Sequence, residues 1–162
     1  MKNGMVKRLS ALLLAAAMVV SLAACGADGK QEEDTASGMT KQEYQQAVQT
    51  LSTEISDIQD RASEIDGTDA EQTKDLLEEL KTPLQDFMAI DPPESYAAGH
   101  EKLRSGCQSL IEYIDLLADA LGETDQTALQ ESSEQMQTLM ESAVADLQEG
   151  AQLLDDADSQ EE

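Results

Sequence analysis

Apolar residues recur in alternating steps of four and three along this sequence, and that spacing restricts the fold more than any other feature. A helix places residues at such steps on one face, where they form a seam that a neighbouring helix can cover. No alternating run of apolar and polar residues, the pattern typical of a strand, competes with it. The sequence therefore predicts an all-α fold.

Four stretches show this spacing. The first includes Tyr44, Val48, Leu51, Ile55, Ile58, Ala62 and Ile65. The second includes Thr73, Leu77, Leu80, Leu84 and Phe87. The third includes Tyr96, His100, Leu103, Cys107, Leu110, Ile114, Leu117 and Leu121. The fourth is less regular because it contains small and polar members, and it includes Leu129, Ser133, Met136, Met140, Ala143, Leu147, Gly150 and Leu154.

Capping and turn signals separate the four stretches. Thr40 and Glu43 occupy the two positions of a capping box at the start of the first helix. Gly67 is typical of the residue that follows a helix C-terminus. The prolines of residues 91–94 suit the first turn of the third helix, and Gly122 marks its end. Links as short as these make successive helices antiparallel.

We therefore expect an antiparallel up-down-up-down four-helix bundle over residues 40–157, followed by an acidic tail over residues 158–162. The preceding residues 25–39 are rich in small, polar and acidic side chains and have no apolar periodicity. That composition predicts a flexible tether.

The first residues have the organisation of a secretion leader. Lys2, Lys7 and Arg8 give a basic start, and residues 9–24 then carry no charged side chain. That apolar run has 16 residues, fewer than the roughly 20 that a helix needs to cross a bilayer. A signal peptide over residues 1–24 therefore fits better than a permanent membrane span.

The end of this leader, Leu22, Ala23, Ala24 and Cys25, resembles the L-A-A-C lipobox of bacterial lipoproteins. The resemblance implies that a peptidase cuts between Ala24 and Cys25 and that a diacylglycerol is attached to the Cys25 sulfur. Two acyl chains meet the requirement for stable anchoring, so the expected location is the extracytoplasmic face of the cell membrane. Ordinary secretory cleavage near the alanines, which would leave Cys25 as a plain thiol, is the alternative.

Acidic residues dominate the charge. The chain has 34 Asp and Glu against 10 Lys and Arg, a formal net charge of −24 at pH 7. Removal of the leader, with three of those basic residues, would leave a charge of −27. Such a surface repels phosphate, which argues against nucleic acid as a partner. No Lys or Arg follows Arg104, and this excess indicates either a solvated acidic face or a surface for cations or a basic partner.

The sequence lacks the patterns of the catalytic sites that helical proteins carry. It has no Glu-x-x-His pair of a di-iron centre and no Cys-x-x-Cys-His of a c-type haem. Among so many carboxylates, no pair stands out as a candidate for acid–base chemistry. We therefore expect no enzyme activity, and no cofactor beyond the lipid on Cys25.

His100 and Cys107 lie seven residues apart on the third seam. Seven residues of helix rise about 10.5 Å, too far for the two side chains to share one metal ion. We expect His100 to be a structural polar residue of the core. Counting residues along antiparallel helices gives it two candidate partners, which are Asp146 and the Glu79 carbonyl that Pro83 leaves without a donor.

Cys107 is expected to be an inert buried thiol. The alternative is a soft metal site, suited to Cu(I), in which Met136 and Met140 of the fourth helix join the Cys107 sulfur. Methionines on an apolar stripe more often fill a core, so we expect no metal.

A second resemblance lies at the proline turn. Its residues are similar to the turn and following helix of small uncharacterised helical lipoproteins of Gram-positive bacteria, namely Pro92, Pro93, Glu94, Ser95, Tyr96, His100 and Leu103. This resemblance implies a location rather than a chemistry.

Two functions fit these expectations. One is a membrane-anchored adaptor that binds a protein or another envelope component through its helix faces or loops. The other is a carrier of a small ligand or metal in the bundle core. A cavity lined by Ser133, Ala143 and Gly150 would favour the carrier, whereas a filled core would favour the adaptor.

Overall fold

The computed structural model describes residues 39–64 and 70–160, and its helices confirm the all-α prediction. The elements are α2 (Lys41–Glu64), α3 (Ala70–Met88), the short 3-10 helix η2 (Glu94–Tyr96), α4 (Ala97–Ala120) and α5 (Gln126–Ser159). The expected signal peptide, the Ala24 and Cys25 junction, the tether up to residue 38, Ile65, Gly67 and residues 161–162 lie outside the described residues.

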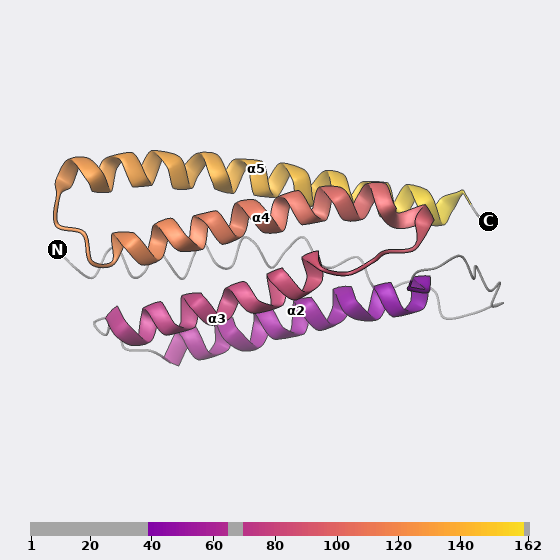
Figure 1. The fold of residues 1–162 in the computed structure, drawn as a ribbon, viewed down its shortest axis with the longest axis horizontal. Helices are drawn as coiled ribbons and strands as arrows, with labels where there is room; N and C mark the ends of the chain where they lie inside the picture. The colour runs from indigo at the N-terminus through magenta and orange to yellow at the C-terminus, as the bar shows by residue number, and fades with distance from the viewer. Residues whose placement is uncertain (1–38, 65–69, 161–162) are drawn as a thin grey trace.

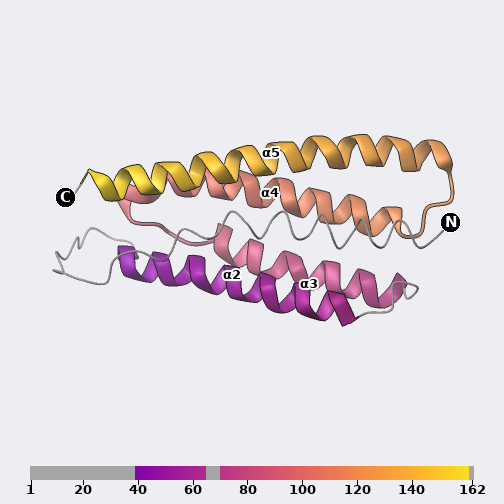
Figure 2. The same cartoon turned by 180° about the vertical axis from the view of Figure 1, so that it is seen from behind.

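The four helices run antiparallel in succession, as predicted (Figure 1). Seen from either side, α2 lies beside α3 and α4 lies beside α5 (Figure 2). We call one end of the bundle the base; α2 begins there and α5 finishes there, at Ser159. At the base, the backbone N–H of Met39 donates to the carbonyl of Asp91 over 3.4 Å. We call the opposite end, where α4 gives way to α5, the far end.

Side-chain caps begin two of the helices. The backbone N–H of Thr40 donates to the Glu43 carboxylate over 2.8 Å, and the N–H of Glu43 donates to the Thr40 hydroxyl over 3.3 Å, so the predicted capping box is confirmed. The Glu43 carboxylate accepts from both the N–H and the hydroxyl of Thr40, and these two bonds lower the pKa of Glu43 because they favour its charged form. At the start of α5, the Asp125 carboxylate accepts from the N–H groups of Thr127 and Ala128.

The proline turn starts the third helix in two steps. The N–H of Tyr96 donates to the carbonyl of Pro93 over 2.8 Å and closes the turn of η2, after which α4 continues from Ala97. Pro83 lies within α3 and is buried in the core rather than ending the helix.

The first three seams supply the core, as their spacing predicts. The buried members of these seams are Tyr44, Leu51 and Ile58 of α2, Leu77, Leu80, Leu84 and Phe87 of α3, and Tyr96, His100, Cys107, Ile114 and Leu117 of the third helical segment. Ile111 and Tyr113 of α4 are buried as well, although they lie off the predicted seam. On α5 only Ala143 and Gly150 are buried, although that helix has 34 residues. Its larger seam residues pack partly buried against the core.

Glycines, which have no side chain, allow α4 and α5 to lie close together near the base. A Cβ at Gly99 would lie 2.7 Å from Leu154 Cδ2, and one at Gly106 would lie 2.7 Å from Leu147 Cγ. At Gly150 an added Cβ would meet the Gly99 carbonyl oxygen at 2.9 Å. Toward the far end the two helices diverge (Figure 1).

Candidate functional site

Three of the four aromatic residues of the chain gather around His100 at the base. The Tyr44 ring centroid lies 5.3 Å from that of Tyr96, 5.6 Å from that of His100 and 6.0 Å from that of Phe87. Antiparallel helices bring these residues together, because Tyr44 lies in the first turn of α2, Phe87 in the last turn of α3, and Tyr96 just before α4. We call these four residues the aromatic cluster.

Inside this cluster His100 has one hydrogen-bond partner. Its Nδ1 lies 3.0 Å from the hydroxyl oxygen of Tyr44, while its Nε2 is buried and has no partner among residues 39–64 and 70–160. Burial lowers the pKa of His100, and the nearby charge of Arg104 lowers it further. Both effects favour the neutral imidazole over its charged form.

The two partners that sequence counting suggested for His100 are wrong. Among the described residues His100 bonds to Tyr44 through Nδ1, and its Nε2 bonds to neither the Glu79 carbonyl nor Asp146. The Glu79 side chain forms a bidentate pair with Arg61, with N to O distances of 2.7 and 2.8 Å. Asp146 binds Lys102 and accepts from the Ser105 hydroxyl. The counting failed because residues 89–93 lie between α3 and η2, so His100 packs against Phe87 rather than against residues deeper in α3.

A polar contact beside the aromatic cluster ties three elements together. Lys41 Nζ lies 3.4 Å from Asp158 Oδ1 and 5.1 Å from the ring centroid of Tyr96. The Tyr96 hydroxyl donates to the same Asp158 oxygen over 2.5 Å. Because α5 continues to Ser159, Asp158 belongs to the folded bundle, although the acidic tail was expected to begin there.

Cys107 is 1% exposed, and burial raises the pKa of its thiol to about 12. Gly106 lies opposite Ala143 on α5, which fixes the register of the two helices. In that register Met140 lies near the level of Cys107. Met136 lies about six residues, or about 9 Å along the axis, from the level of Cys107. Both methionines are partly buried and pack against the core.

Two further arrangements are absent from the part of the chain that the structure describes. No group of three or more His, Cys, Asp and Glu side chains is placed to hold a metal ion among residues 39–64 and 70–160. Within the same ranges, no helix has both the length and the apolar character that a membrane crossing requires.

A groove of about 690 Å³ lies between α4 and α5 where the two helices diverge. Its apolar residues are Leu116 and Leu139, and Gln135 and Thr138 also line it. Its charged residues are all acidic, and they are Glu112, Asp115 and Asp119 of α4 and Glu131 and Glu134 of α5. We call it the acidic groove.

The acidic groove and the contacts of Tyr44, Tyr96 and Asp158 were not predicted from the sequence. A signal for the aromatic cluster was present. Tyr44 and Tyr96 open the first and third seams and Phe87 closes the second, so all three fall at one end of an antiparallel bundle. No comparable signal marked the groove, because carboxylates occur throughout the sequence.

Comparison with known proteins adds one relationship. A family model matches residues 38–149, which is more than half of the chain. The chain belongs to the family of unknown function DUF6376. The DUF6376 match includes every residue that lines the acidic groove, and it stops before Gly150 and Asp158. No curated protein and no solved structure matches the chain.

Proposed function

We propose that this member of DUF6376 is a lipoprotein, anchored through Cys25 on the extracytoplasmic face of the cell membrane, and that it acts as a non-catalytic adaptor for a protein or envelope partner. The observation that carries the proposal is the position of Met39, which contacts Asp91 at the base. An anchor reaching this point from Cys25 would face the base toward the membrane. The far end and the acidic groove would then be open to a partner.

The packing of α5 favours the adaptor over the carrier. The positions expected to line a ligand cavity are Ser133, Ala143 and Gly150. Ser133 is exposed, whereas Ala143 and Gly150 are buried. An added Cβ at Gly150 would meet Leu103 Cδ2 at 2.8 Å, so the space beside this glycine is occupied. A small ligand would have to displace packed side chains there.

The anchor is tested by mass spectrometry of the N-terminus of the protein purified from its membrane. A diacylglycerol on an N-terminal Cys25 is expected, and Cys25→Ala should leave an unprocessed precursor. An unmodified Cys25, or a mature N-terminus at another residue, would contradict the anchor and indicate a freely secreted protein.

The orientation is tested with two matched cysteine variants. Glu94, at the base, and Glu123, at the far end, are both exposed glutamates. On intact cells a bulky thiol reagent should label Glu123→Cys faster than Glu94→Cys, and the two rates should become equal in detergent. Faster labelling of Glu94→Cys on intact cells would contradict the proposed orientation.

A further inference from the structure

The acidic groove exists because α4 and α5 are held together at one end only. Gly99, Gly106 and Gly150 let the helix backbones approach near the base, and no such glycine pairs lie in the far half of the two helices. The helices therefore separate as they run toward the far end (Figure 1). Leu116 and Leu139 line the resulting groove and are partly buried, and Leu139 also packs against the core.

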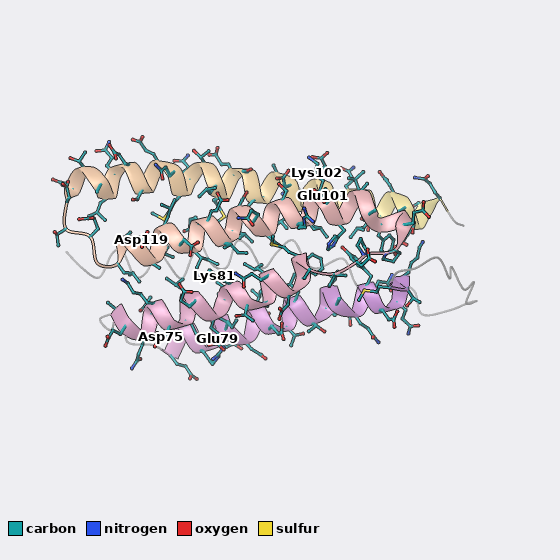
Figure 3. All side chains as sticks on the ribbon, viewed as in Figure 1. Asp75, Glu79, Lys81, Glu101, Lys102 and Asp119 are labelled. Carbon is teal, nitrogen blue, oxygen red and sulfur yellow. The ribbon has the colours of Figure 1, made fainter. Side chains whose placement is uncertain are left out.

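The two halves of this helix pair differ in charge. Near the base, Lys102 of α4, which Figure 3 labels, bridges to Asp146 and Glu149 of α5, with N to O distances of 3.5 and 2.9 Å. In the far half, acidic side chains of α4 face acidic side chains of α5 and no basic residue lines the groove. Like charges that face each other across an interface repel. A cationic ligand between these carboxylates would relieve that repulsion.

One carboxylate of the groove is already neutralised. Asp115 pairs over 2.8 Å with Lys81 of α3, which Figure 3 labels. The four others make no ion pair with any residue that the structure describes, and they are Glu112, Asp119, Glu131 and Glu134. All four are exposed, so a ligand can reach them.

The shape of the groove suits a helix. Its α4 side runs from Glu112 to Asp119, which is about two turns or about 10.5 Å. Apolar residues spaced three and four apart along about two turns of a guest helix would form a stripe long enough to contact both Leu116 and Leu139. Basic residues flanking that apolar stripe would reach the carboxylates on both walls.

We propose that the acidic groove binds a cationic amphipathic helix of a partner protein, an inference that rests on the proposed adaptor function. The apolar floor favours such a helix over a bare cation or polyamine, which would gain nothing from Leu116 and Leu139. A second copy of this chain does not fit, because its net charge of −24 would repel the first.

The test measures binding of the full chain to a synthetic helical peptide of roughly 14 residues, or about four turns, with a leucine stripe flanked by arginines. The control peptide has the same composition in an order that destroys the stripe. The helical peptide should bind at least about tenfold more tightly than the control, and its affinity should fall as salt is added. Equal affinities would reduce the interaction to nonspecific charge attraction and overturn the proposal.

Matched variants of α5 locate the binding site. Glu131→Gln with Glu134→Gln should weaken binding about tenfold, as expected for the loss of two charge pairs. Glu141→Gln with Asp156→Asn removes the same charge from exposed positions of α5 outside the groove and should change affinity less than about twofold. Equal weakening by both pairs would overturn the groove as the site.

Two further measurements address the apolar floor of the acidic groove and the folding of the variants. Leu116→Ser should weaken peptide binding about tenfold by removing apolar contact. Circular dichroism establishes that each variant remains helical. If Leu116→Ser fails to fold, the carboxylate pairs decide the question alone, because removing repelling charges does not destabilise the bundle.

Failure of this inference and failure of the adaptor function give different results. Chemical cross-linking on intact cells, using the wild type and the Glu131→Gln with Glu134→Gln variant, compares capture of a protein partner. If the variant still captures the partner, the acidic groove is not the binding site, but the adaptor function stands. Loss of capture in this variant, but not in the Glu141→Gln with Asp156→Asn control, would support both.

Discussion

The hydroxyl oxygen of Tyr44 and Nδ1 of His100 lie 3.0 Å apart and join the first turn of α2 to the first turn of α4. Within the part of the chain that the structure describes, this is the single hydrogen bond of the His100 side chain, because its Nε2 is buried without a partner. The Tyr44 hydroxyl therefore decides whether a buried imidazole has any partner at all. Such a group costs more free energy when it is left unpaired than its bond contributes when formed.

Removing that hydroxyl should destabilise the bundle. Tyr44→Phe keeps the ring in the aromatic cluster but leaves both ring nitrogens of His100 unpaired, so we expect the free energy of unfolding to fall by about 1 to 3 kcal/mol. Urea unfolding followed by circular dichroism measures it. Tyr113→Phe is the control, since no hydrogen bond depends on that hydroxyl. A similar loss in both variants would assign the effect to the tyrosine ring rather than to the bond.

Stability should depend on pH through His100. Burial lowers the pKa of folded His100 below its ordinary value of 6.5, so the unfolded chain takes up a proton first as the pH falls. The free energy of unfolding should therefore decrease below about pH 6.5 until the lowered pKa is passed, by up to about 1.4 kcal/mol per pH unit. Unfolding titrations of the wild type and His100→Asn isolate this effect from that of the carboxylates. Parallel pH curves for the two proteins would contradict it.

Filling the helix contact near the base should be costly. Gly150→Ala places a Cβ 2.9 Å from the Gly99 carbonyl oxygen and 2.8 Å from Leu103 Cδ2. Overpacking of this kind costs about 1 to 3 kcal/mol, more than the helix propensity gained from alanine. The control is Gly122→Ala, where the nearest atom, Lys74 Nζ, lies 3.9 Å away. A neutral Gly150→Ala variant in thermal melts would show that α4 and α5 can separate at no cost.

The Cys107 thiol should be unreactive in the folded protein. Because its pKa is about 12, little of the thiol is present as the reactive thiolate. Because Cys107 is 1% exposed, a disulfide reagent cannot reach the sulfur. In a Cys25→Ser background, which removes the other cysteine, the labelling of Cys107 should follow global unfolding in urea. Rapid labelling without denaturant would indicate local opening of the core. Cys107→Ala should cost about 1 to 2 kcal/mol through a small cavity.

Added salt should stabilise the protein. With a formal charge of −24, repulsion between like charges outweighs the few surface ion pairs, and salt screens both. Raising NaCl from about 0.05 M to about 0.5 M should increase the melting temperature by several degrees. A decrease would mean that ion pairs such as that of Arg61 with Glu79 dominate the electrostatic balance.

Local signals allowed the helices to be predicted from the sequence. The four-and-three spacing identified buried residues from Tyr44 to Leu117, and the capping box at Thr40 marked the start of α2 correctly. These features depend on neighbours within one or two turns, which the sequence displays directly. The antiparallel order followed from the short links alone.

Contacts between helices could not be predicted in the same way. The length of the segment between α3 and η2 sets which residue of α3 meets His100, and a shift of one turn brings Phe87 there in place of Pro83. The hydrogen-bond partner Tyr44 comes from α2, which is not adjacent to α4 in the sequence. The acidic groove depends on the angle at which α5 crosses α4, which is set by glycines two or more turns away. Periodicity identifies the buried face of a helix but not the residue it meets.

The position of Met39 at the base determines how the bundle would bear mechanical load. A pull applied at Met39 and resisted at the far end acts nearly parallel to the helix axes, because α2 runs from the base toward the far end. Such a force slides α2 along its neighbours, so Tyr44, Leu51 and Ile58 must give way together rather than one after another. The same pull applied across the axes would peel α2 away one turn at a time.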